Sequence, residues 1–193
     1  SHVSSSLHSM KREVYRKLIH FMGVPLPFLA ALNRDLIFFL LLGVIMVYSL
    51  SEGLRYMGFH FPVVSHVTRR ARRLSEFRGF IMGPVSLTVG ILASVILFPP
   101  RVYLPAVLIV CISDSLSGLV GRRFGAHVLP CWKRTLEGSA AFYLSAMAIL
   151  LFFLPVGQAL LLGLVPTVIE LLSPHDLDNL FIPLGTALVL GVV

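Results

Sequence analysis

Four clusters of polar residues border or interrupt apolar stretches of the chain, and their spacing indicates where chemistry could take place. The first cluster is Glu13-x-x-Arg16-Lys17-x-x-His20. The i, i+3, i+4, i+7 spacing puts these four side chains on one face of a helix. Two adjacent cations on that face can bind an anionic group. An interfacial anchor whose cations meet lipid headgroups explains the same pattern.

The second cluster starts with Asp114, near the end of an apolar stretch, and continues with Gly118, Gly121, Arg122 and Gly125. The acid and the three glycines form a single helical stripe, along which another backbone or a ligand can come close. Asp114 lies about 9 Å from the end of the stretch at 1.5 Å per residue. An acid at that depth is a functional-site hypothesis, either as a Mg²⁺ ligand or as a base. The alternative is an acid neutralised by a nearby cation that fixes helix packing.

The third cluster lies just before the fifth apolar stretch, at a predicted helix start. It contains two cations, Lys133 and Arg134, together with Thr135, Glu137 and Ser139. Free N–H groups at a helix N-terminus bind phosphate well. The hydroxyls could cap the helix or bind a ligand, and Glu137 could ligate a metal. A capped helix with a basic flank is the competing explanation.

The fourth cluster joins the sixth and seventh apolar stretches and contains Glu170, Asp176, Asp178 and Asn179. Carboxylates and a carboxamide suit a hard, oxygen-ligated cation such as Mg²⁺. A turn with Asx caps is the alternative. The sequence has no GxxxxGK[ST] loop and no kinase-type GxGxxG motif, so a soluble-type nucleotide fold is not predicted.

The composition determines what kind of fold must position these clusters. The 193 residues are 56% hydrophobic and 13% charged, with a mean hydropathy of +0.89. A soluble domain carries about 25% charged residues, so a soluble globular protein is excluded. The apolar residues occur in long runs rather than alternating, which predicts helices that cross a membrane rather than a barrel.

The expected fold is an all-α, polytopic membrane bundle of about seven transmembrane helices. Several apolar segments are short for a ~30 Å hydrocarbon core, and tilt or burial in the bundle would accommodate them. The seven segments are 18–32, broken by Pro25 and Pro27, and then 36–57, 80–98, 102–120, 138–154, 157–172 and 180–193.

The charges predict the orientation of the bundle. When the segments alternate in direction, all 16 lysines and arginines except Arg34 and Arg101 fall on one side. The positive-inside rule then places the N-terminus in the cytoplasm and the C-terminus outside. This topology explains the pI of about 10.0 without a nucleic-acid partner. The acids except Asp35 lie on or near the same side, which favours a cytoplasmic site.

The chain is expected to form one transmembrane domain over residues 11–193. Residues 1–10 are expected to be a tag remnant or a mobile tail, with Met10 a plausible native start. A weaker feature is the i, i+3 pair of Glu52 and Arg55, interpreted as a simple ion pair. The arginine-rich run at 69–73 is interpreted as a solvated cytoplasmic loop.

The four clusters, in this order, resemble those of the polyprenol kinase family, which includes dolichol, phytol and farnesol kinases and the CTP-dependent diacylglycerol kinase. The resemblance runs along nearly the whole chain from Lys11. Ser115 and Ser117 depart from it where alanines are common, and Arg134-Thr135 replaces a commoner Lys-Ser pairing. The resemblance implies a kinase that transfers the γ-phosphate of CTP, with Mg²⁺, to the hydroxyl of a membrane isoprenoid alcohol.

On this hypothesis Asp114, Asp178 and Glu137 organise Mg²⁺, and Asp114 also accepts the proton of the lipid hydroxyl. Gly118 and Gly121 let the substrate or the nucleotide approach the fourth helix. Glu13, His20 and Glu170 belong to the motifs without a narrower role. The residues assigned to the nucleotide are Lys133, Arg122, Arg16, Lys17, Thr135, Ser139, Gly118, Gly121 and Asn179.

Two other functions remain open from the sequence. A phosphatidate cytidylyltransferase-like enzyme would consume CTP but release pyrophosphate and form a CDP-lipid. A non-enzymatic transporter or lipid-binding protein would place ionisable residues near the bilayer midplane, whereas here the acids gather at one interface. The expected partners are a membrane lipid and a nucleotide. No protein partner is implied, and a homodimer is compatible with the sequence without being required by it.

Overall fold

The computed structural model describes residues 14–57, 82–130, 134–174 and 177–193. These parts of the chain are helical apart from turns, short connections and one isolated bridge between Val128 and Thr135. The all-α prediction is therefore confirmed for them. Several predicted features lie outside the described residues, namely the tail at 1–10, Glu13, the arginine-rich run at 69–73, Lys133 and Asp176.

Residues 14–21 form the first described helix. The elements that follow are α2 (Pro25–Leu32), α3 (Arg34–Tyr56), α5 (Met82–Leu97), α6 (Pro100–Leu108), the π-helix η2 (Ile109–Ser113), α7 (Asp114–Phe124), α8 (Leu136–Leu150), α9 (Val156–Leu162), α10 (Leu164–Leu172) and α11 (Asp178–Leu190).

Each predicted apolar segment corresponds to one helix or to a run of consecutive helices. Proline begins two of the elements, because Pro25 opens α2 and Pro100 opens α6, where a missing N–H costs nothing. Asn33 starts α3 by accepting a hydrogen bond from the Leu36 N–H at 3.0 Å. The fourth segment is one continuous rod through α6, η2 and α7, whereas Gly163 separates α9 from α10.

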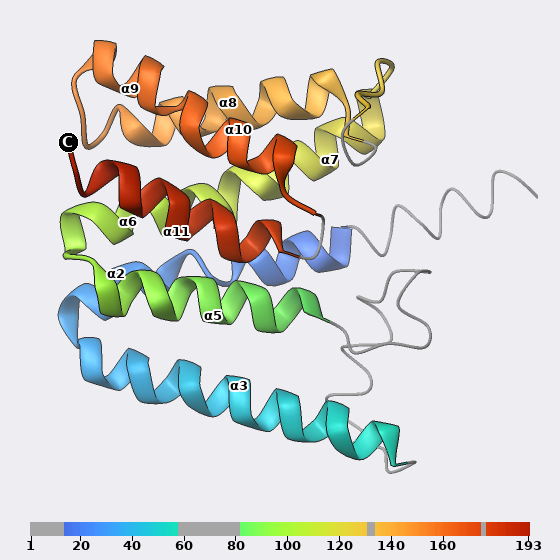
Figure 1. Cartoon of the computed structure of the whole chain (residues 1–193), viewed down its shortest axis with the longest axis vertical. Coiled ribbons are helices and arrows are strands. Elements are labelled where there is room, and N and C mark those ends of the chain that lie inside the picture. Colours follow the sequence, from blue (N-terminus) through green and yellow to red (C-terminus); the bar gives the residue numbers. More distant parts are fainter. Residues whose placement is uncertain (1–13, 58–81, 131–133, 175–176) are drawn as a thin grey trace, which may run out of the picture.

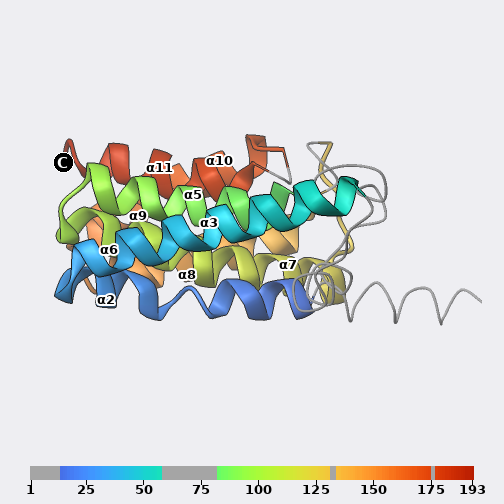
Figure 2. The same cartoon turned by 90° about the horizontal axis from the view of Figure 1, so that it is seen from below.

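The helices run alternately up and down the bundle, so their first and last residues lie at its two ends (Figures 1 and 2). One end collects the start of residues 14–21, the end of α3, the start of α5, the α7–α8 connection and the α10–α11 connection. We call this the network end. Arg34, Arg101 and the last residue, Val193, belong to the turns and terminus at the opposite end. The alternation of sides used to count the charges is therefore present in the fold.

Two helical stretches in the described residues are long and apolar enough to cross a membrane. They are Arg34–Arg55, with 22 residues, and Pro100–Phe124, with 25 residues. The first lies at the edge of the bundle with only 22% of its apolar window buried, whereas 61% of the second is buried. The remaining apolar helices of the described chain are shorter, at 10–17 residues. The outer face of α3 exposes large apolar side chains such as Leu36, Phe39 and Met46.

The central rod changes its winding directly before Asp114. Pro105 lies inside α6, where it cannot donate a backbone hydrogen bond. The buried π-turn η2 follows and ends at Ser113, so Asp114 is the first residue of α7. Single π-turns within α-helices are frequent at functional sites because they re-aim the side chains that follow. The fold therefore sets the direction of Asp114 through an irregularity that no hydrophobic pattern reveals.

Candidate functional site

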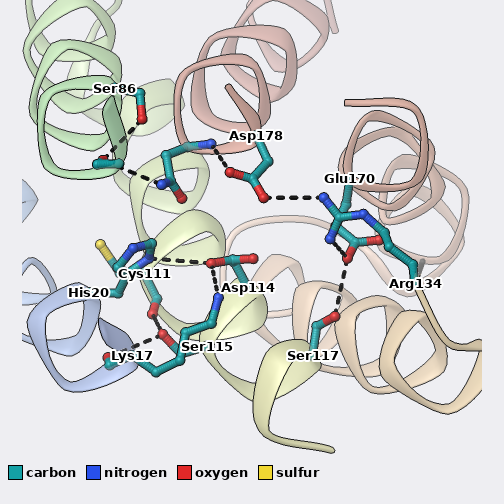
Figure 3. A network of polar contacts seen from close by, with 12 residues as sticks. Lys17, His20, Ser86, Cys111, Asp114, Ser115, Ser117, Arg134, Glu170 and Asp178 are labelled. Carbon is teal, nitrogen blue, oxygen red and sulfur yellow. Dashed lines mark hydrogen bonds and ion pairs between the residues drawn. The ribbon is translucent and has the colours of Figure 1, made fainter. Parts of the chain in front are cut away.

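Charged side chains are buried at the network end of an otherwise apolar bundle. Lys17 is 4% exposed, Asp114 3%, Glu170 1% and Asp178 4%. Such groups are almost never fully buried unless they are paired, because an isolated buried charge is costly. The described structure pairs each of them, and it brings the partners from several different helices together (Figure 3).

The first group joins residues 14–21 to α7. The Lys17 ammonium lies 2.5 Å from Asp114 Oδ2, and His20 Nδ1 lies 3.3 Å from the same oxygen. Lys17 and His20 are three residues apart, so both reach one carboxylate from the same helix face. The predicted shared face is confirmed for these two residues. The Asp114 pairing is also what the helix-packing alternative requires.

The second group is centred on Arg134, which lies two residues before the start of α8. Its Nη1 donates to Glu170 Oε1 on α10, and its Nη2 lies 3.2 Å from Asp178 Oδ2 at the start of α11. Two hydroxyls also donate to Glu170, that of Ser117 at 3.2 Å and that of Ser139 at 3.5 Å. Helices α7, α8 and α10 thus meet around the Glu170 carboxylate, and Arg134 links it to α11.

Asn179 follows Asp178 and is 1% exposed. Its backbone N–H donates to Asp178 Oδ1 at 2.8 Å, and its Nδ2 donates to the Gly83 carbonyl at 3.5 Å. Its amide oxygen is buried and has no hydrogen-bond partner within the described part of the chain. A buried, unsatisfied oxygen is unusual in a folded protein, so this atom is an acceptor available to a ligand.

Helix α7 connects the two groups. Asp114 and Ser117 are one turn apart on it, and they bind the first and the second group respectively (Figure 3). Between them, the Ser115 hydroxyl donates to the Cys111 carbonyl at 2.7 Å and to the Lys17 carbonyl at 3.4 Å. The two groups therefore form one polar network held by α7.

Glu137 does not join this network. Its carboxylate lies 2.8 Å from His127 Nδ1, and the His127 backbone N–H also points to it. The hydrogen bond from His127 lowers the pKa of the Glu137 carboxyl to about 2. Within the described residues, no three His, Cys, Asp or Glu side chains are grouped so as to hold a metal ion. The predicted trio of Asp114, Asp178 and Glu137 is thus not assembled, because Glu137 projects from the first turn of α8 toward the preceding connection.

The glycines of α7 pack against α8. A Cβ on Gly121 would lie 2.7 Å from Thr135 Oγ1 and 3.5 Å from Gly138 Cα. A Cβ on Gly138 would meet the Ser117 carbonyl at 3.0 Å. The glycine stripe was predicted to let either another backbone or a ligand come close. At Gly121 it is another backbone that does so, because α8 packs against this glycine. Gly118 is partly buried on the same helix.

The other predicted nucleotide ligands lie around the network end. Arg16 is half-buried on the first described helix, and Arg122 is exposed in the last turn of α7. Thr135 is the N-cap of α8, where its hydroxyl accepts from the Gly138 N–H at 3.2 Å. Its cap function is the structural alternative stated for the third cluster.

We predict that Thr135→Ala lowers the stability of the protein by about 1 kcal/mol, because the capping oxygen is lost. Thr135→Ser keeps that oxygen and is the matched control, with a smaller expected loss from its missing methyl group. Thermal melting of the two variants in detergent checks this. Equal melting temperatures for the alanine variant and the wild type would contradict the cap.

Arg134 and Ser117 lie in two of the predicted clusters, but the sequence assigns neither of them a role in the site. Arg134 is one of the two cations of the third cluster, and both residues are departures from the resembling motifs. The signal that could have assigned a role to Arg134 is its place directly before Thr135, a hydroxyl predicted to cap the helix. Its carboxylate partners are 36 and 44 residues away in sequence, so no local pattern identifies them.

Comparisons of the chain with protein-family models, with curated proteins and with solved structures find no significant match.

Proposed function

We propose that this protein is a multi-pass membrane kinase that transfers the γ-phosphate of CTP, with Mg²⁺, to the hydroxyl of an isoprenoid lipid alcohol. In this proposal the bundle crosses the membrane about seven times, the N-terminus is cytoplasmic, and the network end faces the cytoplasm. The resemblance of the four polar clusters supports the reaction, and the buried ionic network of the described fold supports the position of the site.

The observation that carries the proposal is the buried ionic network in an apolar bundle. Lys17, Asp114, Arg134, Glu170 and Asp178 converge at one end through pairs of 2.5 Å and 3.2 Å and a contact between Arg134 and Glu170. Ionisable groups inside a membrane protein are costly and mark functional sites by default. Phosphoryl transfer needs both kinds of charge found here, acids for a divalent cation and cations for phosphates.

Two carboxylates and an amide oxygen are the groups proposed to hold Mg²⁺. Asp114 and Asp178 are hard oxygen donors, and the Asn179 amide oxygen is buried without a partner in the described chain. Mg²⁺ usually binds one or two carboxylates together with substrate phosphates and water, rather than a cage made only of protein groups. When bound, it would offset the negative charge of the transferring phosphoryl group. Glu137 is left out of this set because it contacts His127 instead.

The cations next to these acids suit the triphosphate. Lys17 lies against Asp114, and Arg16 precedes it on the same helix. Arg122 is exposed in the last turn of α7, at the network end. Lys133, next to Arg134 in sequence, is proposed as a triphosphate ligand only because of its place in the motif.

Asp114 is the residue proposed to accept the proton of the lipid hydroxyl. It is held in place by Lys17 and His20 and is aimed by the preceding π-helix. In a loose phosphoryl-transfer transition state the base needs to be well positioned more than strong. The alcohol would enter sideways between helices, so that only its hydroxyl reaches the network end while its chain stays in lipid.

The test uses purified protein in detergent or lipid with Mg²⁺ and CTP labelled on its γ-phosphate. Phytol, geranylgeraniol, dolichol and diacylglycerol are offered as acceptors. We expect label in a lipid monophosphate together with release of CDP. Pyrophosphate and a CDP-lipid, formed when a lipid phosphate is supplied, would instead identify a cytidylyltransferase. A folded protein that binds no nucleotide and forms neither product would favour the non-enzymatic transporter or lipid-binding function.

A further inference from the structure

Arg134 is shared between two carboxylates that come from different helices. Its guanidinium binds Glu170 on α10 and lies 3.2 Å from Asp178 at the start of α11, and its side chain is 8% exposed (Figure 3). A guanidinium has five N–H donors. The Nε donor of Arg134 is buried and has no hydrogen-bond partner within the described residues. The side chain therefore keeps a donor free for an anion while it is held by two acids.

Both carboxylates retain other donors if Arg134 turns away. Glu170 is also bound by the hydroxyls of Ser117 and Ser139, and Asp178 Oδ1 accepts from the Asn179 N–H at 2.8 Å. Departure of the arginine would remove one positive partner from each of them but not all of their hydrogen bonds. Two acids in such a state have a strong requirement for a replacement cation.

The position of Arg134 favours a phosphate as the competing anion. Arg134 directly precedes Thr135, the N-cap of the 15-residue helix α8. The positive end of the helix dipole attracts phosphate. The first N–H groups of the helix are already bonded, that of Leu136 to the His127 carbonyl and that of Gly138 to Thr135 Oγ1, so the guanidinium is the donor that meets the anion. A guanidinium matches the geometry of carboxylate and phosphate equally, through two parallel hydrogen bonds. An exchange between the two anions thus costs little geometric strain.

We infer that Arg134 is a phosphate-binding residue that exchanges Glu170 and Asp178 for a phosphate group, and that this exchange frees the two carboxylates to bind a divalent cation. The inference rests on the proposed function for the source of the phosphate, a nucleoside triphosphate. It gives the site an order of events in which the anion releases Asp178, one of the proposed Mg²⁺ ligands, and adds Glu170 as a further carboxylate beside it. Linkage requires that each ligand then strengthens binding of the other by the same factor.

The first half of the exchange is tested without any metal. Binding of tripolyphosphate in EDTA is measured by calorimetry for the wild type, Glu170→Gln and Arg134→Gln. We expect Glu170→Gln to bind about 5-fold to 150-fold more tightly, the usual range for coupled sites, because Arg134 loses a competing carboxylate. Arg134→Gln should bind more weakly than the wild type. A structural role of the ion pair alone predicts no gain in Glu170→Gln, and that result would overturn the inference.

The second half is tested without any anion. Binding of Mn²⁺ alone is followed by electron paramagnetic resonance. We expect Arg134→Gln to bind Mn²⁺ more tightly than the wild type, by a factor in the same range, because Glu170 and Asp178 each lose the positive charge of the Arg134 guanidinium. Arg55→Gln is the matched control, since it leaves the buried Glu52 of a separate ion pair on α3 without its arginine. Equal gains in Arg55→Gln and Arg134→Gln, or no gain in a folded Arg134→Gln, would contradict the exchange.

The inference and the proposed function fail separately. If Arg134→Gln does not fold, the Glu170→Gln measurement in EDTA still decides, because it keeps Arg134. Tighter binding of tripolyphosphate by Glu170→Gln with no lipid phosphorylation would support the exchange and reject the kinase. Lipid phosphorylation by the wild type with no gain in Glu170→Gln would support the kinase and reject the exchange.

Discussion

Asp114→Asn is expected to abolish transfer of label from CTP to lipid and to lower the stability of the protein. The transfer is lost because the asparagine neither accepts the hydroxyl proton nor offers the same charge to Mg²⁺. The stability falls because the substitution leaves Lys17, 4% exposed, without its charged partner at 2.5 Å. Breaking a buried pair from one side costs about 3–5 kcal/mol. The two effects are measured as phosphorylated lipid per folded protein and as the melting temperature.

Adding Lys17→Met to Asp114→Asn separates the loss of transfer from the loss of stability. In Asp114→Asn/Lys17→Met no buried charge of this pair remains, so we expect the melting temperature to recover in part while transfer stays absent. Glu52→Gln is a control for the loss of a buried carboxylate, since Glu52 is 1% exposed and pairs with Arg55 at 2.8 Å. It should lose stability and keep its activity per folded molecule.

The outcomes distinguish catalysis from helix packing at Asp114. Near-normal transfer by Asp114→Asn would show that the assigned role is wrong. Recovery of both stability and transfer in the double variant would mean that the Lys17–Asp114 pair serves only to fix residues 14–21 against α7. That is the alternative that the sequence left open for this acid.

The helices were predictable because apolar length and proline are local properties. The segments 36–57 and 80–98 correspond to α3 and α5 within a few residues. The break of the first segment follows from Pro25, which opens α2. Spacing also predicted that Lys17 and His20 share a face, and depth within an apolar stretch singled out Asp114.

The partners across the bundle were not predictable in the same way. Spacing shows which side chains share a helix face, but not which helix lies opposite that face. Glu137 illustrates this, because its motif placed it with Asp114 and Asp178 whereas its carboxylate binds His127 ten residues earlier. The π-turn before Asp114 could not be predicted from the sequence either. It is too short to change the hydrophobic periodicity of the helix noticeably.

Arg134 shows a further limit of charge patterns. In a membrane protein a basic residue beside an apolar stretch is already explained by the positive-inside rule, so a buried arginine is hidden among surface ones. Only its exposure of 8% and its two carboxylate partners distinguish it. Burial of a charge is a tertiary property. This explains why the sequence assigned site roles to the acids and none to this arginine.

A close contact between α5 and α11 predicts a second substitution with a large effect. Gly90 is buried in α5 against the first turn of α11, where a Cβ would lie 2.5 Å from the Asn179 carbonyl oxygen and 3.1 Å from Leu180 Cα. Both of these atoms are backbone, so they cannot move aside as a side chain can. The same turn of α11 carries Asp178 and its neighbour Asn179, whose Nδ2 reaches the Gly83 carbonyl of α5.

Gly90→Ala is therefore expected to destabilise the protein by at least about 1–3 kcal/mol, the usual cost of overpacking, with a fall in melting temperature of about 2–4 °C per kcal/mol. Because the methyl group pushes the start of α11 away from α5, transfer activity per folded molecule should fall as well. Gly43→Ala in α3 is the matched control, since a Cβ there meets nothing within 4 Å and alanine favours a helix by roughly 0.5–1 kcal/mol over glycine. Its melting temperature should equal or exceed that of the wild type. A wild-type melting temperature for Gly90→Ala would show that α5 and α11 do not pack this closely. It would also contradict the positions of Asp178 and Asn179 in the proposed site.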